Sequence, residues 1–521
     1  MAPVIVAGML GAAFPAGAQA NASGVSCDEL AKLTLPEATI TAAELVNSGQ
    51  YKAPDGPLAR LMTLPGMNVA GRADEGPNPA FCRVAATLKP SSDSDIKVEV
   101  WLPLSGWNGK FLGVGNFGWA GSLMASGMLS GLEEGYATAS TDTGHDSSTP
   151  SGEGGRFAFG HREKLIDYAY RADHLMTIDA KAIIKAFYGA APARSYWIGC
   201  SLGGLEGLIE AKRYPTDYDG IVAGAPPNPL VKFNAAQLWP SWLVNQDPGL
   251  RMPKAKFEMT NKAVLKACAS PVGLKQGFVD EPNNCAFEPK LLLCKGVDGP
   301  ECLTAAQVHL MERIYTGPIN PRTFQVIFPG PAKGSEAELA GFADGNPFPT
   351  ALDLFRYAAF QDPNWDWTKM DWDKDVAMAT ARLGPLLHVD ADLRPFFDHG
   401  GKLLIYVGWN DYHNPEELID YYKSIMHHAG SQAQSSARLF IIPGMGHCFG
   451  GAGCDTFNKL GTIDQWVSLG RRPARVVASR ISDGKVVRTR PLCAYPQLAE
   501  YNDVGDMNDA NSFTCSQSKN E

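Results

Sequence analysis

The stretch that decides the fold is "YWIGCSLGGLEG", which runs from Tyr196 to Gly207. A run of aromatic and β-branched residues leads into a G-x-S-x-G pattern around Ser201, and a helix-like pattern follows it. Strand, tight turn, serine and helix in this order are typical of a nucleophile elbow. Such a turn exposes the serine hydroxyl at the edge of a sheet, with the positive end of a helix beneath it. The pattern therefore predicts a nucleophilic serine, and the rest of the chain has to supply its partners.

A serine at neutral pH is a poor nucleophile, so it needs a histidine to accept its proton and a carboxylate to orient that histidine. In sheets of this class the three residues follow one another as Ser, Asp or Glu, and His. "LLIYVGWND" ends a strand-like run with Asp411, and "FIIPGMGHC" ends the next such run with His447. We therefore expect Ser201, Asp411 and His447 to meet at one edge of the sheet as a catalytic triad.

The competing acids and histidines are less well placed. Asp142 and His145 precede the serine and break the expected order. His413 follows Asp411 by two residues, so we expect it to lie beside this carboxylate and not to face the serine. The alternative for Asp411 and His447 is a purely structural role, as a turn-forming aspartate and a loop histidine.

Two cysteines flank the predicted triad. Cys200 directly precedes Ser201, and Cys448 directly follows His447. Because the serine and histidine side chains of a triad meet at hydrogen-bond distance, their chain neighbours can come within the roughly 4.4–6.8 Å between Cα atoms that a disulfide requires. We therefore predict a Cys200–Cys448 bond, which would hold the histidine within reach of the serine independently of loop packing.

Strand-like runs recur along the chain with helical patterns between them. Besides the stretch before Ser201, the clearest are "KFLGVGNFG", "YATASTDTG", "GIVAGAPP", "KLLIYVGWND" and "RLFIIPGMGH". This alternation predicts an α/β fold, in which helices cover both faces of a mostly parallel sheet.

Residues 228–395 interrupt this alternation, and strand-like runs resume only at Lys402. We interpret them as a lid domain inserted into a catalytic domain that comprises residues 21–227 and 396–521. We expect the lid to fold over the functional edge of the sheet. It contains five of the eleven tryptophans of the chain: Trp239, Trp242, Trp365, Trp367 and Trp372.

The bulk composition excludes some functions. The chain has 521 residues, of which 45% are hydrophobic and 19% charged, as in ordinary soluble proteins. Its formal net charge of −9 argues against nucleic acid as a partner, because nucleic acid is bound by basic surfaces. Beyond the N-terminus, no stretch reaches the roughly 18 uncharged apolar residues of a membrane span. We therefore expect a small-molecule substrate and neither a nucleic-acid nor a membrane partner.

The N-terminus has the features of a secretory signal. The apolar run Val4–Ala18 leads into Ala18-Gln19-Ala20, an A-x-A cleavage pattern, although a basic segment before the run is missing. We therefore assign residues 1–20 to a signal peptide and expect the protein to be secreted or periplasmic. In an exported protein the eleven cysteines predict disulfides, and their odd number leaves one thiol over.

The chain resembles the tannase and feruloyl esterase family, which includes a mono(2-hydroxyethyl) terephthalate hydrolase. The resemblance covers nearly all of the mature chain and rests on "NGKFLGVGNFGWAG", "STDTGH", "YPTDYDGIVAGAP", "YVGWND", "GMGHCFGG" and the Cys-Ser and His-Cys pairs. It implies an α/β-hydrolase fold with a large inserted lid domain, and the triad and active-site disulfide named above. It also implies an oxyanion hole formed by the backbone N–H groups of Leu202 and Gly118, although Phe117 stands where the family usually has glycine.

The resemblance implies four further disulfides, with Cys454 as the free thiol. The implied pairs are Cys27–Cys82, Cys268–Cys285, Cys294–Cys302 and Cys493–Cys515.

The family usually has a calcium loop in its lid, of the form C-D-x-x-D-G-x-x-D-G. Here the run is "CASPVGLKQG", with Ala269, Val272 and Gln276 at the three aspartate positions. Calcium takes six to eight oxygen ligands, several of them carboxylates. We therefore predict that the lid binds no metal and that the protein needs no cofactor. We expect Val272 to pack inward instead, and the nearby acids Asp280 and Glu281 to face solvent.

By resemblance, the protein is expected to be a secreted serine carboxylesterase that hydrolyses esters of hydroxycinnamic or related phenolic acids through an acyl-serine. The alternatives are a tannin acyl hydrolase, an aromatic dicarboxylate monoester hydrolase and, outside the enzymes, an inactive module that binds aromatic ligands. We expect the run "FRYAAFQDPNWDW" to form the binding wall. In it, Phe355 and Trp365 are the candidates for contact with the ring. For Arg356 the sequence favours exposure to solvent, and pairing with a substrate carboxylate is the alternative.

Overall fold

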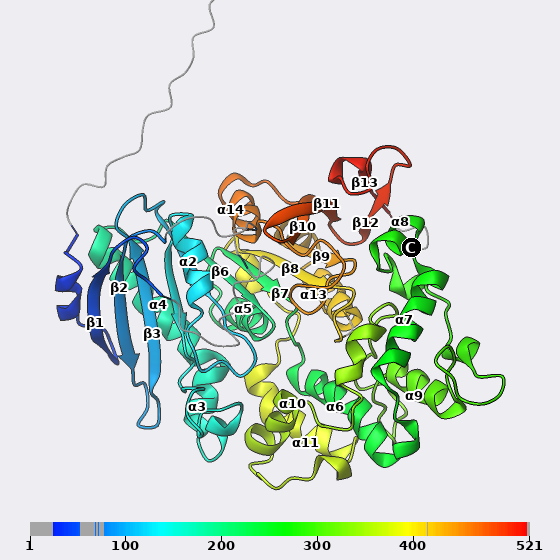
Figure 1. Cartoon of the computed structure of the whole chain (residues 1–521). Coiled ribbons are helices and arrows are strands. Elements are labelled where there is room, and N and C mark those ends of the chain that lie inside the picture. The colour runs from blue at the N-terminus through cyan, green and yellow to red at the C-terminus, as the bar shows by residue number, and fades with distance from the viewer. Residues whose placement is uncertain (1–23, 53–67, 69–70, 72–77, 414, 518–521) are drawn as a thin grey trace, which may run out of the picture.

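A computed structural model describes residues 24–52, 68, 71, 78–413 and 415–517 of the chain. The predicted signal peptide, residues 1–20, lies outside the described residues. The centre of the molecule is a nine-stranded sheet with the order β1-β2-β3-β5-β4-β6-β7-β8-β9 (Figure 1). The strands are β1 (Ala38–Val46), β2 (Phe81–Leu88), β3 (Ile96–Pro103), β4 (Lys110–Val114), β5 (Ala137–Thr141), β6 (Arg194–Cys200), β7 (Gly220–Gly224), β8 (Lys402–Gly408) and β9 (Ala437–Ile442).

The strand-like runs of the sequence form the parallel part of this sheet. β5, β4, β6, β7, β8 and β9 pair in parallel in that order, whereas β1, β2 and β3 are antiparallel. Every residue of β5 and β7 is buried, as expected for strands that are covered on both faces. The predicted α/β fold is confirmed.

The register of the strands shows which helices cover which face. Leu112, Tyr196 and Gly220 are direct neighbours across β4, β6 and β7, and α2 packs on Leu112 while α14 packs on Gly220. Trp197 and Ile221 alternate to the opposite face, where they contact α5, and α4 packs beside α5. These helices and their companions outside the lid are α2 (Ala125–Glu133), α3 (Arg162–Ile166), α4 (Ala172–Tyr188), α5 (Leu202–Arg213), α13 (Glu416–Ser436, kinked at Gly430) and α14 (Lys459–Leu469).

Between the end of β7 and the start of β8 the chain leaves the sheet and folds into helices. The predicted lid, residues 228–395, lies within this fully described interval, and we keep that name for it. The rings of Trp239, Trp242 and Trp372 pack on one another at centroid distances of 4.8–5.5 Å and form an aromatic centre for the lid. The helices of the interval are α6 (Leu230–Gln246), α7 (Lys254–Cys268), α8 (Pro271–Gln276), α9 (Ala305–Thr316), α10 (Pro349–Asp353), α11 (Lys374–Leu387) and α12 (Arg394–Asp398).

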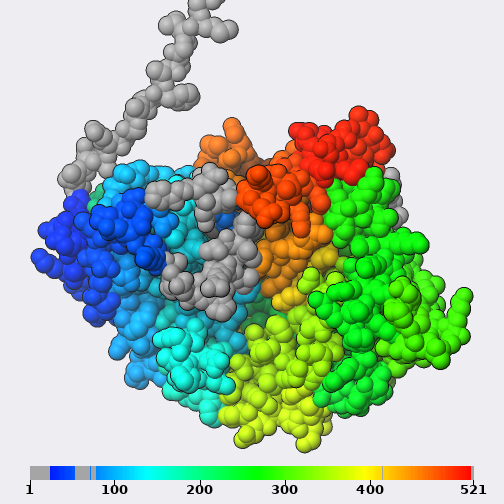
Figure 2. Space-filling view, in the orientation of Figure 1, coloured from blue at the N-terminus to red at the C-terminus, as the bar shows by residue number. Residues whose placement is uncertain are grey.

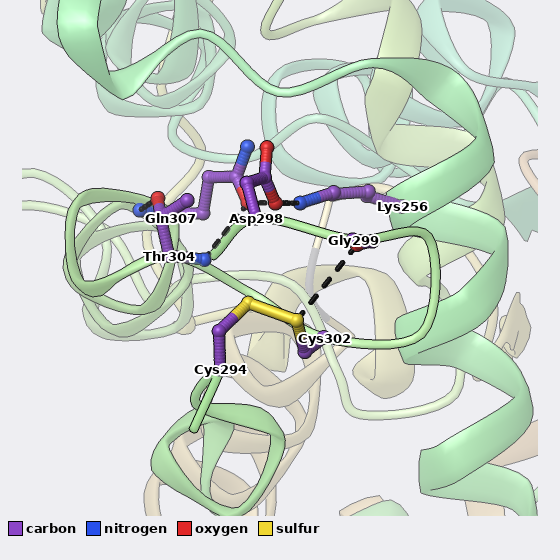
Figure 3. The surroundings of a disulfide bond; sticks show 7 residues. All are labelled: Lys256, Cys294, Asp298, Gly299, Cys302, Thr304 and Gln307. Carbon is purple, nitrogen blue, oxygen red and sulfur yellow. Dashed lines mark hydrogen bonds and ion pairs between the residues drawn. A yellow bond between two sulfur atoms is a disulfide. The ribbon is translucent and has the colours of Figure 1, made fainter. Parts of the chain in front are cut away.

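One lid disulfide closes a short loop before α9 (Figure 3). Within that loop, Asp298 forms an ion pair with the buried Lys256 of α7, whose Nζ also donates to Gln307 Oε1 at 2.8 Å. Gln307 in turn forms a capping box with Thr304 at the N-terminus of α9. The loop therefore joins α7 to α9 through side chains that satisfy one another.

Two β-hairpins follow the sheet at the C-terminus and contact the lid. Figures 1 and 2 show these strands, orange to red, against the green α8 region. Gln276 Nε2 of α8 donates to the Met507 carbonyl at 2.8 Å, which ties the two parts together. The strands are β10 (Arg475–Ser482), β11 (Lys485–Cys493), β12 (Gln497–Tyr501) and β13 (Phe513–Gln517).

The loop after α7 is held by a cation from the protein itself. Val272 is buried, as expected, but the prediction that Asp280 faces solvent is wrong. The Arg490 guanidinium of β11 pairs with Asp280 Oδ1 at 2.5 Å and donates to Gln276 Oε1 at 3.1 Å. Sequence reasoning missed this contact because Arg490 lies far along the chain from the loop.

All five predicted disulfides are present in the structure. The pairs are Cys27–Cys82, Cys200–Cys448, Cys268–Cys285, Cys294–Cys302 and Cys493–Cys515. Cys454 is the free cysteine, and it is buried. Within the described residues, no helix combines the length and the apolar character that a bilayer crossing requires.

Candidate active site

Ser201 stands on a strained turn between β6 and α5. Its φ of 59° and ψ of −123° lie in a region that residues other than glycine rarely adopt. Small neighbours are required around it, since a Cβ on Gly199 would come within 2.3 Å of the Gly203 backbone, and one on Gly203 within 2.7 Å of the Asn116 carbonyl oxygen. The G-x-S-x-G pattern thus has the geometry of a nucleophile elbow.

The structure brings the three predicted catalytic residues together from three strand ends. His447 Nε2 lies 2.8 Å from Ser201 Oγ, and His447 Nδ1 lies 2.7 Å from Asp411 Oδ2. Ser201 follows β6, Asp411 follows β8 and His447 follows β9. Because parallel strands end at the same sheet edge, these three positions meet although they are far apart in the sequence.

The environment keeps Asp411 ionised. Burial alone would raise the pKa of this carboxyl group, but the facing His447 and the hydrogen bonds from His413 and His447 hold its pKa well below the usual range. An ionised Asp411 only accepts hydrogen bonds, so His447 presents Nδ1–H to it, and in the neutral imidazole the lone pair is then on Nε2, which faces the serine. This is the tautomer that accepts a proton from Ser201.

A second histidine shares the same carboxylate. His413 lies beside Asp411, as expected, with Nδ1 and the backbone N–H each 3.0 Å from Asp411 Oδ1. Its Nε2 lies 2.6 Å from Gln237 Nε2 of lid helix α6, and its ring stacks on Phe233. Burial lowers the pKa of His413 to about 3, so this imidazole is neutral near pH 7. Sequence reasoning placed His413 correctly but missed its link to the lid.

The cysteines beside the serine and the histidine are bonded to each other. The Cα atoms of Cys200 and Cys448 are 5.9 Å apart, and the bond spans 248 residues of sequence. Cys448 has a φ of 69° and directly follows His447, whereas Cys200 is the last residue of β6 and directly precedes Ser201. The bond therefore joins the loop after β6 to the loop after β9.

Two backbone segments border Ser201 as donors for a developing oxyanion. Leu202 begins α5, so its N–H has no acceptor within the helix. Gly118, at a φ of 61°, lies on the loop after β4 and lines the same cavity as Ser201 and Leu202. Tyr168 Oη donates to the Gly118 carbonyl at 3.2 Å and holds this loop in place. These positions fit the prediction that the backbone N–H groups of Leu202 and Gly118 form the oxyanion hole.

A cavity of about 90 Å³ opens beside Ser201 and His447. It lies between the sheet edge and the lid, and its walls are mostly aromatic or aliphatic. Its volume is well below the roughly 300–1,000 Å³ of pockets for drug-sized ligands, so it suits one ring of a substrate. The residues of its wall that matter below are Phe117, Trp119, Phe233, Asn234, Gln237, Phe348 and Tyr412.

The predicted binding wall lies elsewhere. None of Phe355, Arg356 and Trp365 is among the residues that line this cavity. Phe355 is fully buried and stacks on Trp365 at 5.2 Å, and Arg356 Nε donates to the Trp365 carbonyl at 3.0 Å. The chain makes a π-helical turn here that directs Leu354 to the cavity and its neighbour Phe355 into the lid core. The expectation that Phe355, Arg356 and Trp365 line the cavity was therefore wrong, because Phe355 lies on the face of this turn that points into the lid core.

Three groups in the described part of the chain bring potential metal ligands together. One consists of Asp411, His413 and His447 of the site itself, where both histidine rings form hydrogen bonds with the Asp411 carboxylate. A second contains the disulfide-bonded Cys294 and Cys302 with Asp298. The third comprises His174, Glu210 and Asp217, where His174 Nδ1 lies 2.6 Å from Asp217 Oδ2. In each group, ligand atoms are already engaged with protein partners.

Comparison with known proteins agrees with this geometry. The family model described as tannase and feruloyl esterase matches residues 82–516. An uncharacterised esterase of Xanthomonas campestris is 34% identical over 95% of this chain and 91% of that protein. A probable feruloyl esterase B-2 of Aspergillus terreus is 30% identical over 96% of each chain.

Solved structures of a feruloyl esterase and a tannin acyl hydrolase have a similar fold. Feruloyl esterase B from Aspergillus oryzae superposes with a TM-score of 0.84 at 29% identity and covers 94% of this chain and 99% of that one. A tannin acyl hydrolase from Aspergillus niger has a TM-score of 0.74 at 19% identity over 94% and 95% of the two chains, a likeness that concerns the fold alone. The fold and its relatives define a carboxylic ester hydrolase with an α/β-hydrolase sheet. The chain belongs to the tannase and feruloyl esterase family.

Proposed function

We propose that the protein is a serine esterase that hydrolyses esters of aromatic acids through an acyl-serine intermediate. The observation that carries this proposal is the pair of contacts at 2.8 Å between Ser201 Oγ and His447 Nε2 and at 2.7 Å between His447 Nδ1 and Asp411 Oδ2. A hydroxyl, an imidazole and an ionised carboxylate in this order are the groups that acyl transfer requires.

In the first half of the reaction, Ser201 Oγ forms a bond to the ester carbonyl carbon while its proton passes to His447 Nε2. The carbonyl oxygen becomes an oxyanion that accepts hydrogen bonds from the N–H groups of Leu202 and Gly118. The ester C–O bond then breaks, and the proton on His447 goes to the departing alcohol oxygen. In the second half, His447 Nε2 takes a proton from water while the water oxygen forms a bond to the acyl carbon. The bond between the acyl carbon and Ser201 Oγ then breaks, the proton on His447 returns to Ser201 Oγ, and the acid leaves.

The cavity supports aromatic acids as the acyl group. Phe117, Trp119, Phe233 and Phe348 surround the space next to the serine, and flat aromatic walls bind rings well. Relatives named as feruloyl esterases support the same substrate class. Tannin hydrolysis and dicarboxylate monoester hydrolysis are alternatives that a substrate panel separates.

We further propose that the protein acts in an oxidising compartment, secreted or periplasmic, and without a metal. Five disulfides support the compartment, because such bonds persist outside the cytosol. The Arg490 guanidinium beside Asp280 and Gln276 supports the absence of a cation requirement in the lid loop.

The test is a substrate panel on the purified protein and on Ser201→Ala. We expect the parent protein to hydrolyse methyl esters of phenolic acids, and Ser201→Ala to lose roughly three to six orders of magnitude of kcat with an unchanged melting temperature. Ser424→Ala, at an exposed position on α13, is the matched control and should retain full activity. Near-native turnover by Ser201→Ala would rule out the proposed mechanism.

A further inference from the structure

Lid helix α6 places two amide side chains in the wall of the cavity beside Ser201. Asn234 and Gln237 are three residues apart, so they lie on the same face of the helix, with Cβ atoms roughly 5–6 Å from each other. Their exposed fractions are only 1% and 5%. Polar groups buried this deeply normally have hydrogen-bond partners.

The partners of Asn234 identify which of its atoms remains without one. Asn234 Nδ2 donates to the Leu230 carbonyl at 3.0 Å, and a carbonyl oxygen can only accept. The other terminal atom is therefore an oxygen. This Oδ1 is buried and has no hydrogen-bond partner in the structure.

Gln237 also has an acceptor without a partner, and its contact with His413 shows which atom this is. Because Asp411 is ionised, His413 must donate through Nδ1 and accept through Nε2. Gln237 Nε2 is therefore the donor in the 2.6 Å contact with His413 Nε2. Its Oε1 is left buried and without a partner.

Asn234 and Gln237 both line the cavity, and each has a buried acceptor that a donor from a ligand can satisfy. An acceptor that is buried without a donor destabilises the site, and a ligand that lacks the donor leaves that deficit in place. Among the described residues that line the cavity there is no lysine or arginine, so a carboxylate on the substrate ring would meet two carbonyl-type oxygens and no cation.

We propose that Asn234 and Gln237 select esters whose acid ring bears two neighbouring hydroxyl groups, each donating to one of the two amide oxygens. This inference rests on the proposed function and refines its substrate class. A ring that bears one hydroxyl and one methoxy group supplies only one donor and is a poorer substrate. A ring that bears a carboxylate supplies none and is rejected.

Hydroxyl donors can come from the acid ring or from a polyol on the alcohol side. The acid ring fits better, because the remaining cavity walls are mostly aromatic or aliphatic and offer few partners to the further hydroxyls of a polyol. The cavity of about 90 Å³ also favours a single ring.

The experiment compares kcat/KM for four methyl esters that share the alcohol and differ in the acid ring. Methyl cinnamate has no ring hydroxyl, methyl p-coumarate has one, methyl caffeate has two, and methyl ferulate has one hydroxyl and one methoxy group. We expect methyl caffeate to exceed methyl cinnamate by on the order of a hundredfold, with the other two between them. This series requires no substitution in the protein.

Asn234→Leu tests the assignment to the lid. It should lower the caffeate-to-cinnamate ratio of kcat/KM about tenfold, because the variant loses the acceptor for a ring hydroxyl that only methyl caffeate carries. Asn245→Leu is the matched control, because Asn245 lies on the same helix, donates to the Ser241 carbonyl at the same 3.0 Å and does not line the cavity. It should leave the ratio unchanged.

Several results would overturn the inference. Equal kcat/KM for methyl caffeate and methyl cinnamate would do so, as would a preference that follows a polyol alcohol, or a preference for a ring carboxylate. An unchanged ratio in Asn234→Leu would remove Asn234 from the site. Hydrolysis of all four esters at one rate leaves the esterase proposal standing, whereas hydrolysis of none of them refutes that proposal as well.

Discussion

At the scale of single residues, the site depends on how Asp411 is held. Its two oxygens accept from two different histidines, and only one of these, His447, reaches the serine. His413 donates to the other oxygen and accepts from Gln237 of the lid. The orientation of the carboxylate is therefore fixed by hydrogen bonds that extend from the sheet edge to the lid.

We predict that His413 is a positioning residue. His413→Leu should lower kcat by roughly tenfold to a hundredfold with little change in KM, because Asp411 loses a donor that fixes its plane. Since that donor also favours the ionised form, the pKa of Asp411 should rise and the acid limb of the kcat profile should move to higher pH. His413→Asn, which can still donate, should recover part of the loss.

The control is His145→Leu. His145 is also buried, and burial lowers its pKa to about 3, but its ring stacks on Phe157 and does not contact the triad. It should leave the pH profile in place even if it lowers the melting temperature. A His413→Leu profile identical to that of the parent would show that His413 only fills space.

At the scale of elements, two catalytic loops depend on one covalent bond. The loops after β6 and β9 carry Ser201 and His447, and Cys200–Cys448 joins them next to both residues. A bond across 248 residues constrains the unfolded chain strongly, by roughly 5 kcal/mol in the chain-entropy model. It also limits how far the histidine can move from the serine.

We predict that Cys200→Ala with Cys448→Ala lowers both the melting temperature and kcat. The matched control removes Cys294 and Cys302, which close only eight residues of lid sequence, for which the same model gives roughly 2–3 kcal/mol. The control should lower the melting temperature less and leave kcat unchanged. Equal kcat in the two double variants would contradict a positioning role for the Cys200–Cys448 bond. Peptide mapping without reduction verifies the pairing.

At the scale of the whole molecule, the C-terminal strands brace the lid. Arg490 of β11 pairs with Asp280 and Gln276, and its guanidinium also lies over the rings of Phe278 and Phe513 at 5.0 and 4.7 Å. In Figure 2 the red C-terminal region lies directly beside the green part of the lid. The buried guanidinium of Arg490 thus supplies the positive charge that faces the Asp280 carboxylate.

We predict that metal chelation leaves the stability and activity of the protein unchanged, whereas substitution of Arg490 lowers its stability. EDTA should change neither the melting temperature nor the activity. Arg490→Met should destabilise the fold by on the order of 2 kcal/mol, since Asp280 and Gln276 lose their partner. Arg322→Met is the control, because Arg322 pairs with Asp373 while its side chain is 71% exposed, and exposed ion pairs contribute little to stability. A melting temperature that falls with EDTA and recovers with calcium would contradict the prediction.

Buried acids make the stability of the molecule depend on pH. Glu206 of α5 lies beneath the active-site loops, and burial raises its pKa to about 8, although the Asn116 N–H that it accepts opposes the shift. Burial and the nearby Glu206 also raise the pKa of Asp173. Between about pH 4.5 and pH 8 the folded Glu206 keeps a proton that the unfolded chain loses, so stability falls as the pH rises through this window.

We predict that the melting temperature falls between pH 5 and pH 8 and that Glu206→Gln reduces this fall. The amide oxygen of glutamine can still accept from Asn116, and the variant has no proton to lose. The free energy of unfolding of Glu206→Gln should equal that of the parent at pH 5 and exceed it at pH 8 by a few kcal/mol at most. Glu338→Gln, at an exposed position, should follow the parent curve. Parallel curves for Glu206→Gln and the parent would contradict the assignment.

What the sequence by itself determined is local or depends on chain order. The elbow around Ser201, the strand ends that carry Asp411 and His447, and the cysteines next to two of these residues are all readable from short patterns. Parallel strands place successive strand ends at one edge, so a local pattern and an order suffice to predict which residues meet. The parallel core and the triad contacts follow from that rule.

Only the tertiary structure decided what surrounds the triad. Periodicity indicates that a residue is buried but not against which partner, so the lid run that looked most aromatic directs Phe355 into its own core. The cavity wall instead comes from α6, where Asn234 and Gln237 read as ordinary polar residues of a helix. Arg490 likewise meets Asp280 only through a fold that brings segments 210 residues apart together. Contacts between distant segments follow from the packing of whole elements, which no local window contains.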